Sequence, residues 1–253
     1  RVVAISPSTA AALRRYDVDT EAVIPPGCEP PQVTRKRLAP SGSPRLIWIG
    51  RLVRAKLPND AIAAFESVRQ AIPRATFDLV GGGYLEEYIR AQHHLSVTVR
   101  GFVDEPVKAS LLAHADVLLL PGTREGWGIV AMEAASYGVP VIAYDIPGLR
   151  DVVLDGVTGV VVRPNPNALG SAAADLLQDA DRWRQFSAAA QQRASEFTWD
   201  TAARDLLSIL MQPTTKDVGL KSLSAAPNQC RQTSSRYLYF THSPFQPRSC
   251  EGH

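Results

Sequence analysis

Two glutamates eight positions apart, Glu125 and Glu133, are the residues of this sequence best placed to do chemistry. Glu125 stands in a glycine-rich turn and Glu133 in a helix-compatible run, so the two carboxylates are expected at different depths of one cleft, where they can bind different hydroxyl groups. Gly126 and Gly128 let the backbone approach a ligand, and the helix that follows directs unpaired N–H groups and partial positive charge toward it. An anion such as a diphosphate suits that position.

A second group of candidate residues follows the apolar run at 45–49. The segment GRLVRAK, residues 50–56, places an arginine and a lysine directly after an expected strand. Breaking a bond between a sugar and a phosphate builds negative charge on the departing diphosphate, and fixed cations stabilise that charge as it develops. Arg51 offers a planar fork of donors and Lys56 a point charge, whereas Arg54 is expected at the surface.

Both groups need a scaffold that brings distant segments of the chain to one edge. Apolar runs alternate with helix-patterned stretches from Arg45 onward, which predicts an α/β, Rossmann-like, doubly wound parallel sheet. The expected strands are 45–49, 76–80, 97–99, 116–120, 139–144 and 159–162. The expected helices are 59–71, 84–94, 106–114, 127–137 and 167–178, with two more between 180 and 210. Open α/β sheets bind ligands at the carboxyl ends of their strands, where both groups lie.

The composition is that of a globular chain without a nucleic-acid or membrane-spanning signature. Of the 253 residues 45% are hydrophobic, and 27 basic against 25 acidic residues give a net charge of +2 without a dense basic block. No apolar run approaches the ~20 residues needed to cross a bilayer. Cys28, Cys230 and Cys250 are too scattered for a disulfide framework or a metal site. We therefore expect a cytoplasmic protein that does not bind nucleic acid.

The sequence from Glu125 to Val162, EGWGIVAMEAASYGVPVIAYDIPGLRDVVLDGVTGVVV, resembles the E-x7-E region of retaining GT-B glycosyltransferases, the glycosyl transferases group 1 family. GRLVRAK resembles that family's G-R-L-x-x-x-K motif. The resemblance covers roughly residues 1–210 and is strongest from 45 to 163. It implies a hexosyltransferase-type enzyme that moves a sugar from a nucleotide diphosphate sugar to an acceptor hydroxyl, with retention of the anomeric configuration.

Under this resemblance the chain divides into five parts. The expected parts are a remnant of the N-terminal acceptor domain at 1–27, a linker at 28–44, a nucleotide-sugar-binding Rossmann-like domain at 45–178, C-terminal helices at 179–212 and an irregular or disordered tail at 213–253. The Rossmann-like part would be the C-terminal domain of a GT-B fold, with the N-terminal domain mostly missing. Most acceptor contacts belong to that missing domain, so the 253 residues alone are expected to be inactive.

The resemblance also assigns residues to parts of the donor. Arg51 and Lys56 would contact the diphosphate, Glu125 the hydroxyls of the transferred sugar, and Glu133 the hydroxyls of the ribose. None of them is expected to be a nucleophile. The other expected donor-binding positions are Gly50, Gly81, Gly83, Phe102, Val103, Gly126, Trp127, Gly128 and Ile129. Phe102 and Val103 would border the base. The glycines at 81 and 83 equally suit a structural turn, and the indole at 127 equally suits packing.

No metal or cofactor is expected. The sequence contains no D-x-D metal motif, and GT-B enzymes generally work without a catalytic metal. His93 and His94 are neighbours on an expected helix and therefore do not face one site. A departure from the family is the Leu57-Pro58 pair, since many relatives carry glycine directly after the lysine of the motif; it bears on the shape of the loop more than on its charge.

Other functions remain open at this level. The chain could be a non-catalytic nucleotide-sugar-binding module, or a GT-B-like epimerase or phosphorylase. A phosphorylase would need a lysine that holds pyridoxal phosphate, and no such signature is recognisable. The expected acceptor is a sugar, a lipid or a small molecule bound mainly by the N-terminal domain, and peripheral membrane association of the full enzyme remains open.

Overall fold

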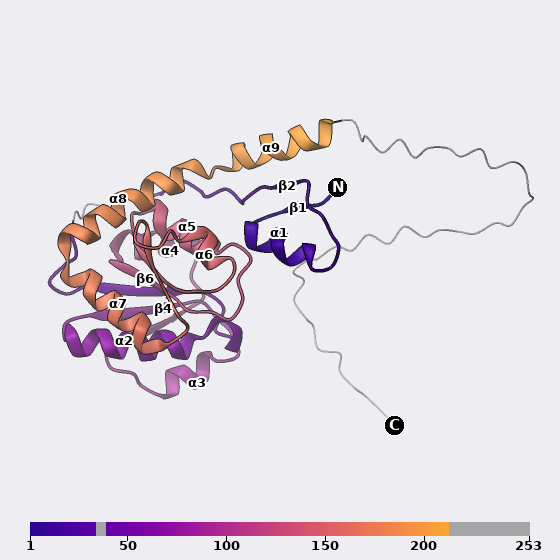
Figure 1. The fold of residues 1–253 in the computed structure, drawn as a ribbon. Helices are drawn as coiled ribbons and strands as arrows, with labels where there is room; N and C mark the ends of the chain where they lie inside the picture. Colours follow the sequence, from indigo (N-terminus) through magenta and orange to yellow (C-terminus); the bar gives the residue numbers. More distant parts are fainter. Residues whose placement is uncertain (34–38, 213–253) are drawn as a thin grey trace, which may run out of the picture. The chain divides into compact units, whose positions relative to one another are not determined.

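A six-stranded parallel sheet lies at the centre of the protein, in the order β5-β4-β3-β6-β7-β8 (Figure 1). The computed structural model describes residues 1–33 and 39–212, which fall within one compact unit. The strands are β3 (Arg45–Ile49), β4 (Thr76–Val80), β5 (Val97–Gly101), β6 (Val117–Leu120), β7 (Val141–Tyr144) and β8 (Gly159–Val162). Every pairing between them is parallel, which confirms the predicted doubly wound α/β sheet. The expected irregular tail, 213–253, lies outside the described residues.

The strands read as continuous apolar runs because helices cover both faces of the sheet. Every side chain of β6 and of β7 is buried. Farther along the sheet, Phe77 of β4 stacks on Phe65 with 5.1 Å between the ring centroids. A core of this kind holds the ends of the strands in fixed positions, and with them the loops that follow.

Helices lie on both sides of the sheet (Figure 1). One side carries α2 (Pro58–Ala71), α3 (Glu86–Ala91) and α7 (Pro166–Gln178). The other side carries α4 (Glu105–His114), α5 (Ile129–Ser136) and the short α6 (Leu149–Val152). The helix α8 (Ala180–Glu196) packs against both α7 and α5. No helix in the described part of the chain combines the length and apolar character needed to span a bilayer.

The first residues form a small strand-helix-strand unit. The strand β1 (Val3–Ala4) pairs in parallel with β2 (Ala22–Val23), and α1 (Pro7–Arg14) connects them. Ser6 caps this helix, since its Oγ accepts a hydrogen bond of 3.0 Å from the N–H of Thr9. The N–H of Ser8 donates to Oδ2 of Asp151 in α6 at 2.9 Å, so this unit is joined to the loop region beyond β7.

The last described helix, α9 (Trp199–Met211), begins where the expected linker crosses the domain. The N–H of Cys28 donates to the carbonyl of Phe197 at 2.8 Å. A Cβ atom added at Gly27 would lie 2.2 Å from the backbone nitrogen of Trp199. The chain at the start of the expected linker, Gly27 and Cys28, is therefore in close contact with the junction between α8 and α9.

The order of the strands reverses between β3 and β6. From β3 the chain builds outward through β4 to β5, then returns to place β6 on the other side of β3. The loops that follow these two strands consequently begin side by side at their carboxyl ends, where open α/β sheets bind ligands. The N–H and Oγ1 of Thr123 both donate to the carbonyl of Ala55, at 3.0 and 3.2 Å, and tie the two loops together.

Tyr144, at the end of β7, fastens α2 to the sheet. Its ring is fully buried and its hydroxyl donates to Oδ2 of Asp60 at 2.8 Å. Burial is the main reason that the pKa of Tyr144 lies far above its ordinary value, and the bond to Asp60 and the negative charge of that carboxylate raise it further. The phenol is therefore protonated at neutral pH and donates to Asp60.

Replacing Tyr144 with phenylalanine is expected to lower the free energy of unfolding by about 1 to 2 kcal/mol, because Asp60 loses a hydrogen-bond donor. Urea denaturation at neutral pH measures the change. Tyr88→Phe is the matched control, since its exposed hydroxyl should contribute less than about 0.5 kcal/mol. Equal stabilities of the two variants would contradict a role for the Tyr144 hydroxyl in stability.

Candidate functional site

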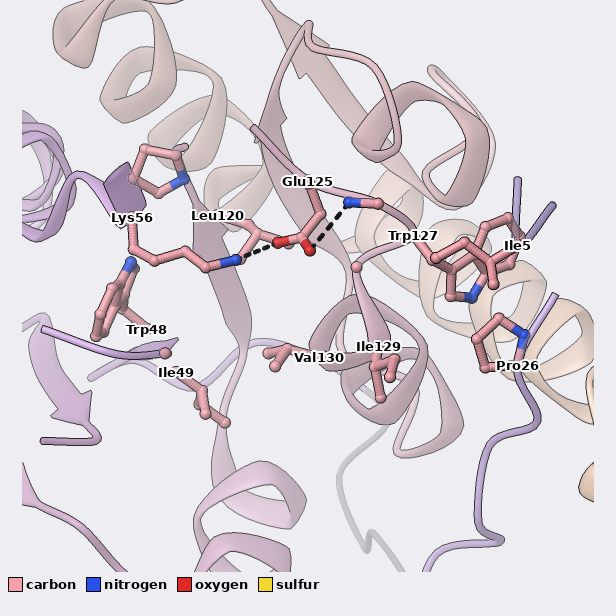
Figure 2. Close-up of a pocket in the computed structure, with 14 residues that line it drawn as sticks. Ile5, Pro26, Trp48, Ile49, Lys56, Leu120, Glu125, Trp127, Ile129 and Val130 are labelled. Carbon is pink, nitrogen blue, oxygen red and sulfur yellow. Dashed lines mark hydrogen bonds and ion pairs between the residues drawn. The ribbon is translucent and has the colours of Figure 1, made fainter. Parts of the chain in front are cut away.

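A cavity of about 280 Å³ opens where the loops after β3 and β6 meet (Figure 2). Its walls come from the ends of both strands, from the start of α5 and from the N-terminal segment, which contributes Ile5 and Pro26. The sequence-predicted site residues that line it are Gly50, Lys56, Glu125, Gly126, Trp127, Gly128 and Ile129. Residues predicted from two separate motifs thus share one hollow at the reversal point of the sheet.

Lys56 and Glu125 form an ion pair inside this cavity. Nζ of Lys56 donates to Oε2 of Glu125 at 2.5 Å, and Figure 2 shows the two side chains pointing toward each other from the two loops. Oε1 of Glu125 accepts a longer bond, 3.3 Å, from the N–H of Gly126. About a quarter of each side chain is exposed, 26% for Lys56 and 24% for Glu125. A cation and an acid are therefore both within reach of one small ligand.

The start of α5 adds a second feature that suits an anion. Gly128 is its N-cap residue, with φ of 86° in the left-handed region that favours glycine. No side chain caps this helix, and its first two residues, Ile129 and Val130, line the cavity. The first N–H groups of a helix have no partner within the helix and carry partial positive charge. Negative charge bound beside Lys56 would be stabilised from this side as well.

Other predicted residues lie outside the cavity wall. Arg51 is exposed and does not line the cavity, although it directly follows Gly50. Phe102 is 87% exposed, and Val103 packs against the core from its edge. Glu133, one helical turn beyond the lining residues of α5, bonds to a lysine of the neighbouring helix α4. The structure therefore brings Lys56 and Glu125 together and leaves these four residues outside the cavity wall.

Gly81 and Gly83 pack against the loop after β3. A Cβ atom at Gly81 would lie 1.9 Å from the carbonyl oxygen of Gly50, and one at Gly83 would lie 2.4 Å from that of Leu52. These contacts alone require glycine at both positions. Neither glycine lines the cavity, so a contact between them and a ligand stays a prediction.

Trp127 is largely a packing residue. It is 4% exposed, and its ring lies 5.3 Å from that of Phe197, measured between centroids. In the described ranges its indole N–H, like that of Trp48, has no hydrogen-bond partner, although both residues line the cavity. Buried donors are usually paired, so these two groups stand out in the cavity wall.

The Leu57-Pro58 pair has a structural cost. Leu57 adopts φ of 49°, in the left-handed region, where it is the N-cap of α2, and Pro58 is buried as the first residue of that helix. Such a conformation costs a residue other than glycine about 1 to 2 kcal/mol. A glycine at this position would adopt the same conformation without that cost. Lys56 nonetheless reaches the cavity, so the pair affects strain in the loop and leaves the cation in place.

Sequence reasoning missed Lys108 of α4, whose Nζ lies 3.0 Å from Oε1 of Glu133. The spacing of Glu105 and Lys108 indicates a pair within one helix, and Nζ does lie 2.9 Å from Oε2 of Glu105. Nothing in the sequence indicates a partner on another helix. In the ranges that the structure describes, no three side chains of His, Cys, Asp or Glu are arranged to hold a metal ion.

A family model and curated relatives both match this chain, and both are of glycosyltransferases. The family model described as glycosyl transferases group 1 matches residues 31–193. The glycogen synthase of Mycobacterium tuberculosis is 35% identical over 170 residues, which are 64% of this chain and 41% of the relative. The D-inositol 3-phosphate glycosyltransferase of Xylanimonas cellulosilytica is 32% identical over 219 residues, 78% of this chain and 52% of the relative. The chain thus spans about half the length of the curated relatives it matches.

The fold also has solved counterparts. The crystal structure of Anabaena Alr3699/HepE in complex with UDP and glucose is similar with a TM-score of 0.69 and 22% identity, over 83% of this chain and 62% of that one. Identity this low supports a likeness of fold alone. The parallel-sheet α/β fold is that of GT-B glycosyltransferase domains.

Proposed function

Because the chain belongs to the glycosyl transferases group 1 family, we propose that it is the donor-binding half of a retaining glycosyltransferase. The whole enzyme would move a sugar from a nucleotide diphosphate to an acceptor hydroxyl and keep the configuration at the anomeric carbon. The observation that carries the proposal is the ion pair of Lys56 and Glu125, 2.5 Å apart in one cavity where the strand order reverses.

The donor would lie across the loops after β3 and β6. Its diphosphate would bind between Lys56 and the uncapped start of α5, where positive charge converges. The transferred sugar would lie at Glu125. The nucleoside would extend along α5 toward Glu133, with the base near Phe102. The HepE structure holds UDP, so UDP is one of the nucleotides to test with this chain.

In the proposed reaction the bond between the anomeric carbon and the diphosphate oxygen breaks, and its electron pair leaves with the diphosphate. Lys56 and the N–H groups of α5 would stabilise the charge that develops on that oxygen. A new bond then forms between the anomeric carbon and the acceptor oxygen, whose proton is released. Glu125 would bind hydroxyls of the sugar without forming a bond to carbon. In this proposal the protein's own groups, and not a metal, neutralise the charge.

Donor binding would exchange the partners of the ion pair. The diphosphate, with more negative charge than a carboxylate, would take over Lys56 and release Glu125 to accept hydrogen bonds from sugar hydroxyls. Glu125 therefore has opposite effects on two ligands. It competes with a nucleoside diphosphate for the lysine, and it binds the sugar of a nucleotide sugar.

Replacing Glu125 with glutamine should separate these two effects. We expect the variant to bind UDP about 3- to 10-fold more tightly and to lose a similar factor in its preference for UDP-sugar over UDP. Isothermal calorimetry with UDP and UDP-glucose measures both. Glu87→Gln, an exposed carboxylate of α3, is the control and should change neither. Weaker binding of both ligands by Glu125→Gln would argue that the carboxylate acts only on the fold of the loop.

The proposal as a whole is tested by titrating the chain with UDP, ADP, GDP and their glucose conjugates. Binding of one diphosphate, with weaker binding of the matching monophosphate, is the expected result. Absence of binding by all of them would overturn the proposal.

Retention is tested separately. Proton NMR of the product of an active full-length enzyme gives its anomeric configuration. Three statements stay predictions: the 253 residues alone do not turn over substrate, the protein is cytoplasmic, and the acceptor is a sugar, a lipid or a small molecule.

A further inference from the structure

The contact between α4 and α5 involves a charge that the proposed reaction does not use. Lys108, in the first half of α4, extends to Glu133 of α5, and its Nζ lies 3.0 Å from Oε1 of that carboxylate. Both side chains are mostly covered, at 18% and 25% exposure. The two helices lie on the same side of the sheet (Figure 1). This ion pair is therefore a contact between helices in a half-buried setting, where charges are less screened than at the surface.

Lys108 has a second partner, but a weaker one. Glu105 lies on the same helix, 2.9 Å from Nζ, and its side chain is 71% exposed. Exposed pairs of this kind contribute little. Burial by itself lowers the pKa of Lys108, but the bonds to Glu105 and Glu133 more than offset that effect and raise the pKa above its ordinary value. Lys108 therefore carries its charge at neutral pH.

The surroundings of Glu133 leave Lys108 as the group that fixes its carboxylate. Within the described residues, Lys108 is the side chain that bonds to the carboxylate oxygens of Glu133. Ser136 bonds instead to the backbone carbonyl of Glu133, at 2.7 Å. Burial is the main reason that the pKa of the nearby Cys28 thiol rises to about 11, and the charge of Glu133 adds to that rise. The thiol is thus neutral at neutral pH and adds no negative charge beside Glu133.

Glu133 is also placed where a nucleoside would pass. It follows Ile129 and Val130 by four and three positions, so it lies on the face of α5 that lines the cavity, one turn farther along. Only Oε1 of Glu133 is bonded to Lys108, and Oε2 remains able to accept hydrogen bonds. A carboxylate held by one oxygen presents the other in a defined direction.

We propose that Lys108 is a positioning residue for recognition of the donor ribose, because it holds the Glu133 carboxylate in the orientation that accepts bonds from the ribose hydroxyls. This inference rests on the proposed function, in which the nucleoside lies along α5. It assigns a task to a residue that belongs to neither glutamate motif nor to the GRLVRAK segment. Without Lys108, the Glu133 carboxylate would be free to rotate away from the ribose hydroxyls.

The test compares UDP with 2′,3′-dideoxy-UDP, which lacks both ribose hydroxyls. Calorimetry on the wild-type chain gives the ratio of the two dissociation constants. Lys108→Met is expected to weaken UDP binding by about 5- to 10-fold and to change binding of the dideoxy compound by less than about 2-fold, so the ratio falls toward one. Lys108→Arg, which keeps the charge, should restore most of the ratio. Glu105→Gln, which removes only the exposed partner, should leave it unchanged.

A double-mutant cycle completes the test. In a Glu133→Ala background the ratio should already be low, and adding Lys108→Met should not lower it further. Thermal denaturation shows whether the Lys108→Met variant is folded. A folded Lys108→Met variant that keeps the wild-type ratio would overturn the inference and leave the proposed function standing. An equal loss for both ligands would also overturn it. Failure of the wild-type chain to bind UDP or any other nucleoside diphosphate would overturn the proposed function itself.

Discussion

Replacing Lys56 with alanine is expected to weaken binding of a nucleoside diphosphate by about 10- to 100-fold. The substitution removes a cation from the cavity and leaves Glu125, now unpaired, 24% exposed and beside the ligand. Both changes weaken the binding of a diphosphate. In an active full-length enzyme, turnover should fall by ~10² or more, since Lys56 is proposed to stabilise the charge of the leaving group. Calorimetry measures the first effect and steady-state kinetics the second.

The chain provides a control two residues away. Arg54 belongs to the same segment but is exposed and does not line the cavity, so Arg54→Ala should change the affinity by less than about 2-fold. Uridine, which lacks phosphate, should bind wild type and Lys56→Ala equally. A raised KM with normal kcat would show that Lys56 binds the ground state and transition state alike, contrary to the role proposed for it.

Gly148→Ala is expected to lower the free energy of unfolding by roughly 3 kcal/mol. Gly148 has φ of 87° and precedes α6. A Cβ atom there would lie 2.3 Å from the carbonyl oxygen of Glu125, closer than any real contact, so the loop that carries Glu125 would have to move. Urea denaturation measures the loss of stability, and affinity for UDP-glucose should fall with it.

Gly156→Ala separates the two causes of this effect. Gly156 also has a positive φ, 71°, but a Cβ atom there meets nothing within 4 Å. It should therefore show only the cost of the left-handed conformation, about 1 kcal/mol. If Gly148→Ala and Gly156→Ala lowered the free energy of unfolding by similar amounts, the backbone of Glu125 could move at little cost. The site would then be less rigid than proposed.

The strands could be predicted closely because their composition leaves little choice. β3, β4 and β8 have the bounds that their apolar runs indicate. The helix expected at 84–94 is shorter, Glu86–Ala91, because His93 turns into the left-handed region with φ of 47°. Neither α6 nor the single 3-10 turn η1 (Arg54–Lys56) was predicted, since one turn is too short to show periodicity.

The site could be predicted in part, for a reason that lies in the sheet. Motifs that follow two strands on either side of a reversal must meet, and this brings Lys56 to Glu125. A sequence motif does not show in which direction each of its side chains points in the folded protein. Arg51 and Lys56 belong to one segment, yet only Lys56 lines the cavity. The partner of Glu133 could not be predicted either, because it depends on how α4 and α5 are rotated against each other.

The two bonds that Thr123 donates to the carbonyl of Ala55 join segments 68 positions apart. Because the acceptor is a main-chain oxygen, almost any amino acid at position 55 would preserve the join, whereas its geometry depends on the path of both loops. Transplanting the loop after β3 from a relative, in order to alter donor preference, therefore requires that the loop after β6 be transplanted with it. For protein engineering the two segments form one exchangeable unit.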